Sequence, residues 1–194
     1  MELYLLTPPR DSFLSPLLRC IKAGVDRLQY RRPNHSDRAR LEELKSVQSI
    51  TRRNDIPLVV NNRPDLAEAV DAEGVHLGRD DLPVRTVVEQ WQKLEIGLTR
   101  RVEDELNSPA DYYGVGPVFK PRGKELSVEP CGWDGVKRVL ERTDRPVYAI
   151  GGITPERARN VPEGLSGIAV ITSVWSRTDP AQAVRTYRDI LDNR

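Results

Sequence analysis

Two patterns of apolar and polar residues follow one another along this chain, one typical of strands and the other typical of helices. Short apolar runs, such as 57–61, predict buried strands. Longer polar-rich segments, such as 36–53, carry apolar residues at helical spacing. Strands are predicted at 3–6, 27–31, 57–61, 74–77, 94–98, 112–115, 147–150 and 167–171. Helices are predicted at 12–23, 36–53, 64–72, 82–91, 102–106, 133–140 and 180–191, and another begins at Pro155.

Strand and helix follow one another about eight times, which predicts a parallel sheet with helical crossovers. About eight units fit a closed (β/α)8 TIM barrel better than an open, doubly wound sheet. The chain has 194 residues, whereas such barrels typically have about 250, so several helices must be short. We see no linker and no repeat beyond the unit itself. The prediction is therefore an α/β fold, a compact single-domain barrel over residues 1–194.

Composition narrows the class of protein. The 30 lysines and arginines nearly balance the 29 aspartates and glutamates, which argues against a general nucleic-acid binder. Cys20 and Cys131 lack the spacing of a metal site and fit a reducing compartment. No apolar run approaches membrane length, and the first residues lack a signal-peptide pattern. We therefore expect a soluble, cytoplasmic protein that binds neither nucleic acid nor membrane.

A candidate phosphate site follows the last two predicted strands. Gly151 and Gly152 allow a tight turn and a close backbone approach to a ligand, and the next segment begins a helix. Thr172 and Ser173 place two hydroxyls at the end of the following strand. Phosphate sites of (β/α)8 barrels often form after strands 7 and 8, so we favour a phosphate site here over a simple strand-to-helix turn.

Polar residues also follow the other predicted strands, where barrel enzymes carry their chemistry. They comprise Gln29, Arg31, Arg32, Asn61, Asn62, Arg63, Arg79, Asp80, Asp81, Thr99, Arg100, Arg101, Arg122 and Lys124. Many cations with a few carboxylates suggest a polyanionic ligand and a divalent metal, although a solvated rim is the alternative for each arginine. The polar loop 120–130 is a candidate lid. His76 lies between apolar neighbours and is expected to be structural.

Five motifs run in order across nearly the whole chain: QYR at 29–31, VNNRPDLA at 60–67, GVHLGRDDLP at 74–83, GVGPVF at 114–119 and AIGGITP at 149–155. Together they resemble the thiamine phosphate synthase and thiazole tautomerase (TenI) family. The resemblance implies a (β/α)8 barrel, often dimeric, which leaves a homodimer open. The synthases join hydroxymethylpyrimidine pyrophosphate to thiazole phosphate, release pyrophosphate and use magnesium. The tautomerases isomerise a thiazole carboxylate phosphate.

The resemblance also implies roles for individual residues. Gln29 and Arg31 match contacts to the pyrimidine and its pyrophosphate, and Asn61 matches an asparagine of the same site. Asp81 matches a magnesium ligand. Lys124 matches a lysine of the loop after strand 6, and with Arg31 it is our candidate catalytic residue. Gly152 matches the thiazole phosphate site, as do Thr172 and Ser173.

The chain departs from the family pattern at several of these positions. Asn62 replaces an aspartate that binds magnesium, and Pro33 replaces a lysine. Both threonines of the loop before Lys124 are missing. Thr99 replaces a serine, and Arg101 replaces the histidine that serves the tautomerases as acid and base. The expected magnesium is therefore held weakly or lost.

Three functions remain open from the sequence. The leading one is a synthase-type transferase, in its usual or a diverged form, acting on small phosphorylated pyrimidine and thiazole substrates. The second is a tautomerase-type isomerase, which needs an acid or base other than Arg101, because arginine does not exchange a proton near neutral pH. The third is a protein that binds a phosphorylated thiazole without catalysis. Fold alone does not choose among them.

Overall fold

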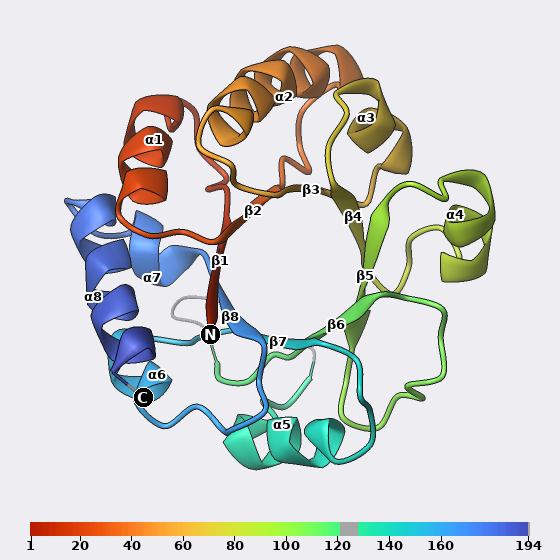
Figure 1. The fold of residues 1–194 in the computed structure, drawn as a ribbon, viewed down its shortest axis with the longest axis vertical. Coiled ribbons are helices and arrows are strands. Elements are labelled where there is room, and N and C mark those ends of the chain that lie inside the picture. The colour runs from red at the N-terminus through yellow and green to blue at the C-terminus, as the bar shows by residue number, and fades with distance from the viewer. Residues whose placement is uncertain (121–127, 194) are drawn as a thin grey trace.

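The computed structural model describes residues 1–120 and 128–193 and shows a closed barrel of eight parallel strands (Figure 1). The strands are β1 Glu2–Leu6, β2 Arg27–Tyr30, β3 Leu58–Asn61, β4 Gly74–Leu77, β5 Glu95–Arg100, β6 Tyr112–Val115, β7 Val147–Ile150 and β8 Gly167–Val170. Each strand pairs with its neighbours in sequence, and β1 pairs with β8 to close the barrel. The predicted fold is confirmed.

Helices lie outside the strands (Figure 1). They are α1 Leu14–Lys22, α2 Asp37–Arg52, α3 Pro64–Ala69, α4 Val84–Gln90, α5 Gly132–Leu140, α6 Pro155–Ala158, α7 Thr172–Trp175 and α8 Pro180–Asp192. Several are short, as the length of the chain requires. None of the helices in the described part of the chain is long and apolar enough to cross a membrane.

The helix predicted at 102–106 is wrong, because residues 101–111 connect β5 to β6 without one. The Asp104 carboxylate accepts the backbone N–H of Arg101 at 2.9 Å and pairs with the Arg79 side chain. The Tyr113 hydroxyl donates to the Leu106 carbonyl at 2.7 Å. These side chains satisfy the backbone locally, and a segment of five residues is too short to form a helix without strong tertiary support.

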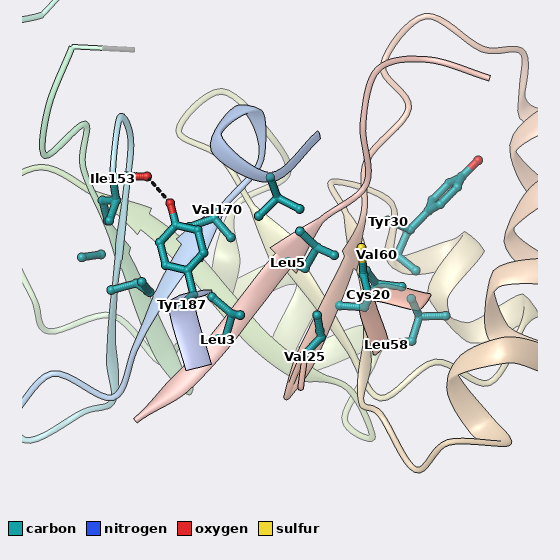
Figure 2. Close-up of a cluster of buried hydrophobic side chains, with 14 of the residues drawn as sticks. Leu3, Leu5, Cys20, Val25, Tyr30, Leu58, Val60, Ile153, Val170 and Tyr187 are labelled. Carbon is teal, nitrogen blue, oxygen red and sulfur yellow. Dashed lines mark hydrogen bonds between the residues drawn. The ribbon is translucent and has the colours of Figure 1, made fainter. Parts of the chain in front are cut away.

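The larger core lies between the strands and the surrounding helices (Figure 2). Leu3 and Leu5 of β1 point into it, and Tyr187 reaches it from α8. The Tyr187 hydroxyl donates to the Ile153 carbonyl at 2.8 Å, which ties α8 to the loop after β7 (Figure 2). Through this bond, the larger core supports the loop after β7, which carries the phosphate-site candidates Gly151 and Gly152.

A second, smaller core fills the inside of the barrel with alternate residues of the strands. Its largest members are Tyr4, Tyr112 and Tyr148, whose rings meet edge to face at centroid distances of 5.1 to 6.4 Å. Gly97 makes room for them, because a Cβ there would lie 2.1 Å from the Tyr112 ring and 2.5 Å from Nδ1 of His76. The three tyrosine rings fill the middle of the barrel. Charged side chains lie on their amino-end side, and a cavity lies on their carboxyl-end side.

Candidate active site

A cavity of about 280 Å³ opens at the carboxyl ends of the strands. All eight strands contribute side chains to its lining, and β2 and β8 also contribute the residue just after them. The lining residues are Tyr4, Leu6, Gln29, Arg31, Asn61, His76, Thr99, Tyr112, Gly114, Tyr148, Ile150, Ala169 and Ile171. Four residues predicted from the sequence, Gln29, Arg31, Asn61 and Thr99, are thus brought together in one cavity.

Five of the lining side chains form a continuous hydrogen-bond chain across the cavity. Gln29 Nε2 donates to the Tyr4 hydroxyl at 3.0 Å, and that hydroxyl lies 3.1 Å from the Tyr112 hydroxyl. The Tyr112 hydroxyl lies 3.2 Å from Nδ1 of His76, and Nε2 of His76 lies 3.0 Å from Oγ1 of Thr99. The hydrogen-bond chain therefore links β2 to β5 through the middle of the barrel.

His76 belongs to the site and is neutral there. Burial lowers the pKa of its imidazole to about 4, so the ring carries one proton at physiological pH. Both ring nitrogens have partners, which agrees with the expected structural histidine, yet the ring also lines the cavity. Sequence reasoning missed this second aspect, as it missed the three tyrosines. Alternation along the strands, which points every second residue inward, is the signal that could have found them.

The amino end of the barrel is closed by an ionic cluster. The Arg27 guanidinium lies 5.5 to 5.8 Å from the ring centroids of the three tyrosines and pairs with Glu95 and, at 3.4 Å, with Glu2. The Tyr148 hydroxyl donates to Glu2 at 2.8 Å. Although burial opposes the charge, the hydrogen bond to Glu95 and its negative charge raise the pKa of Arg27, which keeps it protonated.

Arginines predicted at the strand ends divide into two groups. Arg32, Arg63 and Arg79 form ion pairs with Asp11 and Glu43, with Asp37 and Asp65, and with Asp104, respectively. Their charges are therefore used within the protein. Arg31 is exposed at the cavity mouth, and within residues 1–120 and 128–193 its guanidinium forms no ion pair. Arg100 and Arg101 also form no ion pair within those residues, but Arg31 lines the cavity and they do not, so Arg31 is placed to meet an anionic ligand.

The phosphate-site candidates lie together beside the cavity. Gly151 and Gly152 have positive φ angles of 106° and 59°, and their amides donate to no other residue in the described part of the chain. Thr172 is exposed at the start of α7. The Ser173 side chain is used differently, because it hydrogen-bonds to Tyr187. Thr154 caps α6 by accepting the N–H of Arg157.

The two residues proposed for the metal, Asp81 and Asn62, each hydrogen-bond to a different partner. Asp81 accepts the backbone N–H of Gly78 at 2.5 Å through Oδ2. The Asn62 side-chain oxygen accepts from Nδ2 of Asn61 at 2.6 Å. Among the described residues no group of three or more His, Cys, Asp or Glu side chains is arranged to hold a metal ion. Lys124 and Arg122 lie outside the described residues, as does most of the predicted lid.

Comparisons with known proteins identify the family of the chain. A family model described as thiamine monophosphate synthase (TMP-TENI) matches residues 3–174. A thiamine-phosphate synthase of Chloroflexus aurantiacus is 36% identical, with 88% of this chain and 82% of that protein covered. A thiamine-phosphate synthase of Persephonella marina is 33% identical, with 100% and 97% covered.

A solved structure gives the same result. Thiamine phosphate pyrophosphorylase from Pyrococcus furiosus superimposes with a TM-score of 0.91 at 33% identity, covering 99% of this chain and 96% of that one. A 3-hexulose-6-phosphate synthase from Salmonella typhimurium, at 14% identity and a TM-score of 0.75, shares the barrel fold. By sequence and by structure, this chain belongs to the thiamine monophosphate synthase family.

Proposed function

We propose that this protein is a transferase that joins hydroxymethylpyrimidine pyrophosphate to thiazole phosphate and releases pyrophosphate. The observation that carries the proposal is the single cavity that unites Gln29, Arg31, Asn61 and Thr99 in a chain of this family. The names of its relatives support it, since this chain matches proteins named thiamine-phosphate synthase over most of their length. The relatives' names also support thiamine biosynthesis as the pathway.

The reaction breaks the carbon–oxygen bond to pyrophosphate and forms a bond from the thiazole nitrogen to the same carbon. The leaving pyrophosphate takes the bonding electrons, so the protein must stabilise negative charge there. Arg31 suits this role because it is exposed at the mouth of the cavity and its guanidinium offers a fork of N–H donors. Lys124 is assigned the same role by resemblance. Gln29 and Asn61 orient the pyrimidine, and Thr99 lies across the cavity from them.

The thiazole phosphate is assigned to the loops after β7 and β8. The amides of Gly151 and Gly152 and the exposed Thr172 hydroxyl supply donors for its oxygens. Ser173 contributes its backbone, since its hydroxyl faces Tyr187. Binding both substrates in one cavity replaces a collision in solution with a reaction between held neighbours.

Magnesium fits this site as an ion bound mostly by substrate. The ion retains several waters and commonly uses one or two carboxylates together with phosphate oxygens. Asp81 supplies one carboxylate, and Asn62 supplies a neutral oxygen in place of a second. When bound, magnesium would neutralise charge on the leaving pyrophosphate. We propose that Asp81 holds it weakly and that Arg31 carries part of the charge that the ion neutralises in relatives with a second aspartate.

The isomerase alternative has less support. A tautomerase must move a proton on the ring, and Arg101 replaces the family's histidine. His76 does not substitute for it, because its pKa of about 4 makes it a weak base and its ring nitrogens are both engaged. The predicted homodimer and cytoplasmic location stay predictions.

One assay tests these functions together. The purified protein is incubated with both synthase substrates, with and without magnesium, and products are measured by mass spectrometry. We expect coupled product and an equal amount of pyrophosphate, formed faster with magnesium. A parallel incubation with thiazole carboxylate phosphate would reveal tautomerase activity. If thiazole phosphate binds but neither reaction proceeds, the protein is a binding module and the proposal is wrong.

A further inference from the structure

We propose that the hydrogen-bond chain couples Gln29 to Thr99, so that the orientation of the Gln29 amide decides whether Thr99 offers its hydroxyl hydrogen to a ligand. In the arrangement observed, Gln29 offers its carbonyl oxygen and Thr99 offers its hydroxyl hydrogen. The site then reads the pattern of donors and acceptors on a flat ring. The identity of that ring rests on the proposed function, whereas the coupling itself does not.

Counting hydrogens along the chain gives its direction. A tyrosine hydroxyl and a neutral imidazole each have one hydrogen to donate. Tyr4 accepts from Nε2 of Gln29 and therefore gives its own hydrogen to Tyr112. Tyr112 in turn donates to Nδ1 of His76. The imidazole proton is then on Nε2, where it donates to Oγ1 of Thr99.

Burial excludes the opposite direction for this orientation of Gln29. If Thr99 donated to His76, each hydrogen would move one place along, and the Tyr4 hydrogen would lack an acceptor among the described residues. Tyr4 is 1% exposed, so water cannot accept that hydrogen, and an unsatisfied buried donor is costly. Thr99 is half-buried at the cavity, so its hydrogen is available to a ligand.

A second arrangement also satisfies every hydrogen bond of the chain, and it reverses the groups that Gln29 and Thr99 present to the cavity. Turning over the Gln29 amide places its oxygen against the Tyr4 hydroxyl. Every hydrogen in the chain then points the other way, and Thr99 donates to Nε2 of His76. Gln29 would offer N–H groups to the cavity and Thr99 would offer an oxygen lone pair. Mixed arrangements leave a buried group without a partner, which is why the two ends change together.

This coupling favours a ring that has a donor on one side and an acceptor on the other. An aminopyrimidine has both, because its amino group donates to Gln29 and a ring nitrogen accepts from Thr99. A methoxy analogue replaces the amino donor with an acceptor oxygen, and its methyl group prevents tautomerism, so the ring nitrogen stays an acceptor. Neither arrangement satisfies it, because the one that suits the methoxy oxygen removes the hydrogen of Thr99 from the ring nitrogen.

The test compares dissociation constants of the aminopyrimidine pyrophosphate and its methoxy analogue, measured by calorimetry. We expect the wild type to prefer the amino compound by at least about tenfold, the effect of one mismatched hydrogen bond. Tyr112→Phe breaks the chain, lets Gln29 turn independently, and should reduce the preference to about threefold or less. Tyr113→Phe is the matched control, because its hydroxyl donates to Leu106 and it does not line the cavity, so the preference should remain. Equal preferences in wild type and Tyr112→Phe would overturn the proposal.

A measurement without substrate tests the coupling separately. Nitrogen-15 NMR distinguishes the two imidazole nitrogens, and a His76→Gln spectrum identifies the signals, since the protein has two histidines. We expect an unprotonated Nδ1 and a protonated Nε2 in His76, with the Nδ1 signal shifted in Tyr112→Phe. The reverse assignment would indicate the second arrangement. The same tautomer in wild type and in Gln29→Glu, whose carboxylate can only accept from Tyr4, would contradict the coupling. If the NMR result holds and neither pyrimidine binds, the proposed function fails and the coupling stands.

Discussion

Asn62 occupies a backbone conformation that few residue types adopt easily. Its φ angle is 66°, in the left-handed region where asparagine and aspartate are the best tolerated after glycine. Its amide donates to the His76 carbonyl at 2.9 Å and its side chain accepts from Asn61. Replacing the carboxamide with a carboxylate therefore keeps the shape, the backbone and this side-chain bond, and it changes mainly the charge.

Asn62→Asp should restore the missing magnesium ligand. We expect magnesium to support binding of the pyrimidine pyrophosphate at an about tenfold lower concentration than in the wild type, because a carboxylate binds this hard cation far better than an amide. Magnesium titrations at fixed substrate measure the shift. Asn160→Asp, on an exposed loop, makes the same charge change as a control. Coincident curves for wild type and Asn62→Asp would remove position 62 from the metal site.

Gly152→Ala should weaken binding of thiazole phosphate at least about tenfold, the loss of roughly one charge-assisted hydrogen bond. A Cβ at this position would lie 2.6 Å from the Phe119 carbonyl oxygen, so the loop must move. Gly164→Ala is the matched control, since Gly164 also has a positive φ of 82° but has no atom within 4 Å of the added Cβ. Calorimetry should show the loss in Gly152→Ala alone. Equal affinities would place the phosphate elsewhere.

At the scale of elements, α8 is the support of the phosphate-site loops. Its Tyr187 side chain is fully buried and contacts the loop after β7 through Ile153 and the start of α7 through Ser173. Tyr187→Phe should lower the free energy of unfolding by about 1–3 kcal/mol, because the buried Ile153 carbonyl loses its partner. It should also weaken thiazole phosphate binding by about threefold to tenfold, since the two loops lose a common anchor.

Tyr113→Phe separates these two effects. Tyr113 is equally buried, and its hydroxyl donates to Leu106 in the connection between β5 and β6. Urea unfolding should show a comparable loss of stability, whereas binding of thiazole phosphate should stay at the wild-type level. A similar loss of affinity in both variants would mean that general loosening, and not support of the phosphate loops by α8, accounts for the result.

The elements were predictable where their periodicity was long or strongly apolar. Each strand appears within a few residues of its predicted range, and α2 and α8 match closely because their apolar stripes extend over several turns. The segment 102–106 misled because its spacing allows one helical turn, whereas Asp104 and Tyr113 satisfy the same backbone groups without a helix. The short helix α7 carries too few residues for any periodicity.

At the scale of the whole molecule, strand ends were easier to assign than the barrel interior. Gln29, Asn61 and Thr99 could be placed at one edge because parallel strands share a carboxyl end. The ion pairs of Arg32, Arg63 and Arg79 join segments distant in sequence and could not be recognised without coordinates. Burial, which makes His76 neutral, is likewise a property of the complete barrel.

His76 also gives the molecule a pH-dependent stability. Its pKa is about 4 in the folded protein and about 6.5 when unfolded, so the unfolded state binds more protons between these values. Stability is therefore complete above pH 6.5 and falls as the pH decreases toward 4. We expect this group to account for about 1–3 kcal/mol of the loss. Urea unfolding of wild type and His76→Gln at each pH tests this, since their carboxylates are the same. Parallel curves would contradict it.

The ionic cluster of Arg27, Glu2 and Glu95 determines how molecules enter and leave the barrel. Because these charged side chains and three tyrosine rings close the amino end, molecules can enter the cavity only from the carboxyl end of the barrel. A molecule seated against His76 and Tyr112 lies deeper than anything held by the glycine loops at the rim. The more deeply bound molecule must therefore enter first and leave last, so the closed amino end of the barrel imposes an order of binding and release.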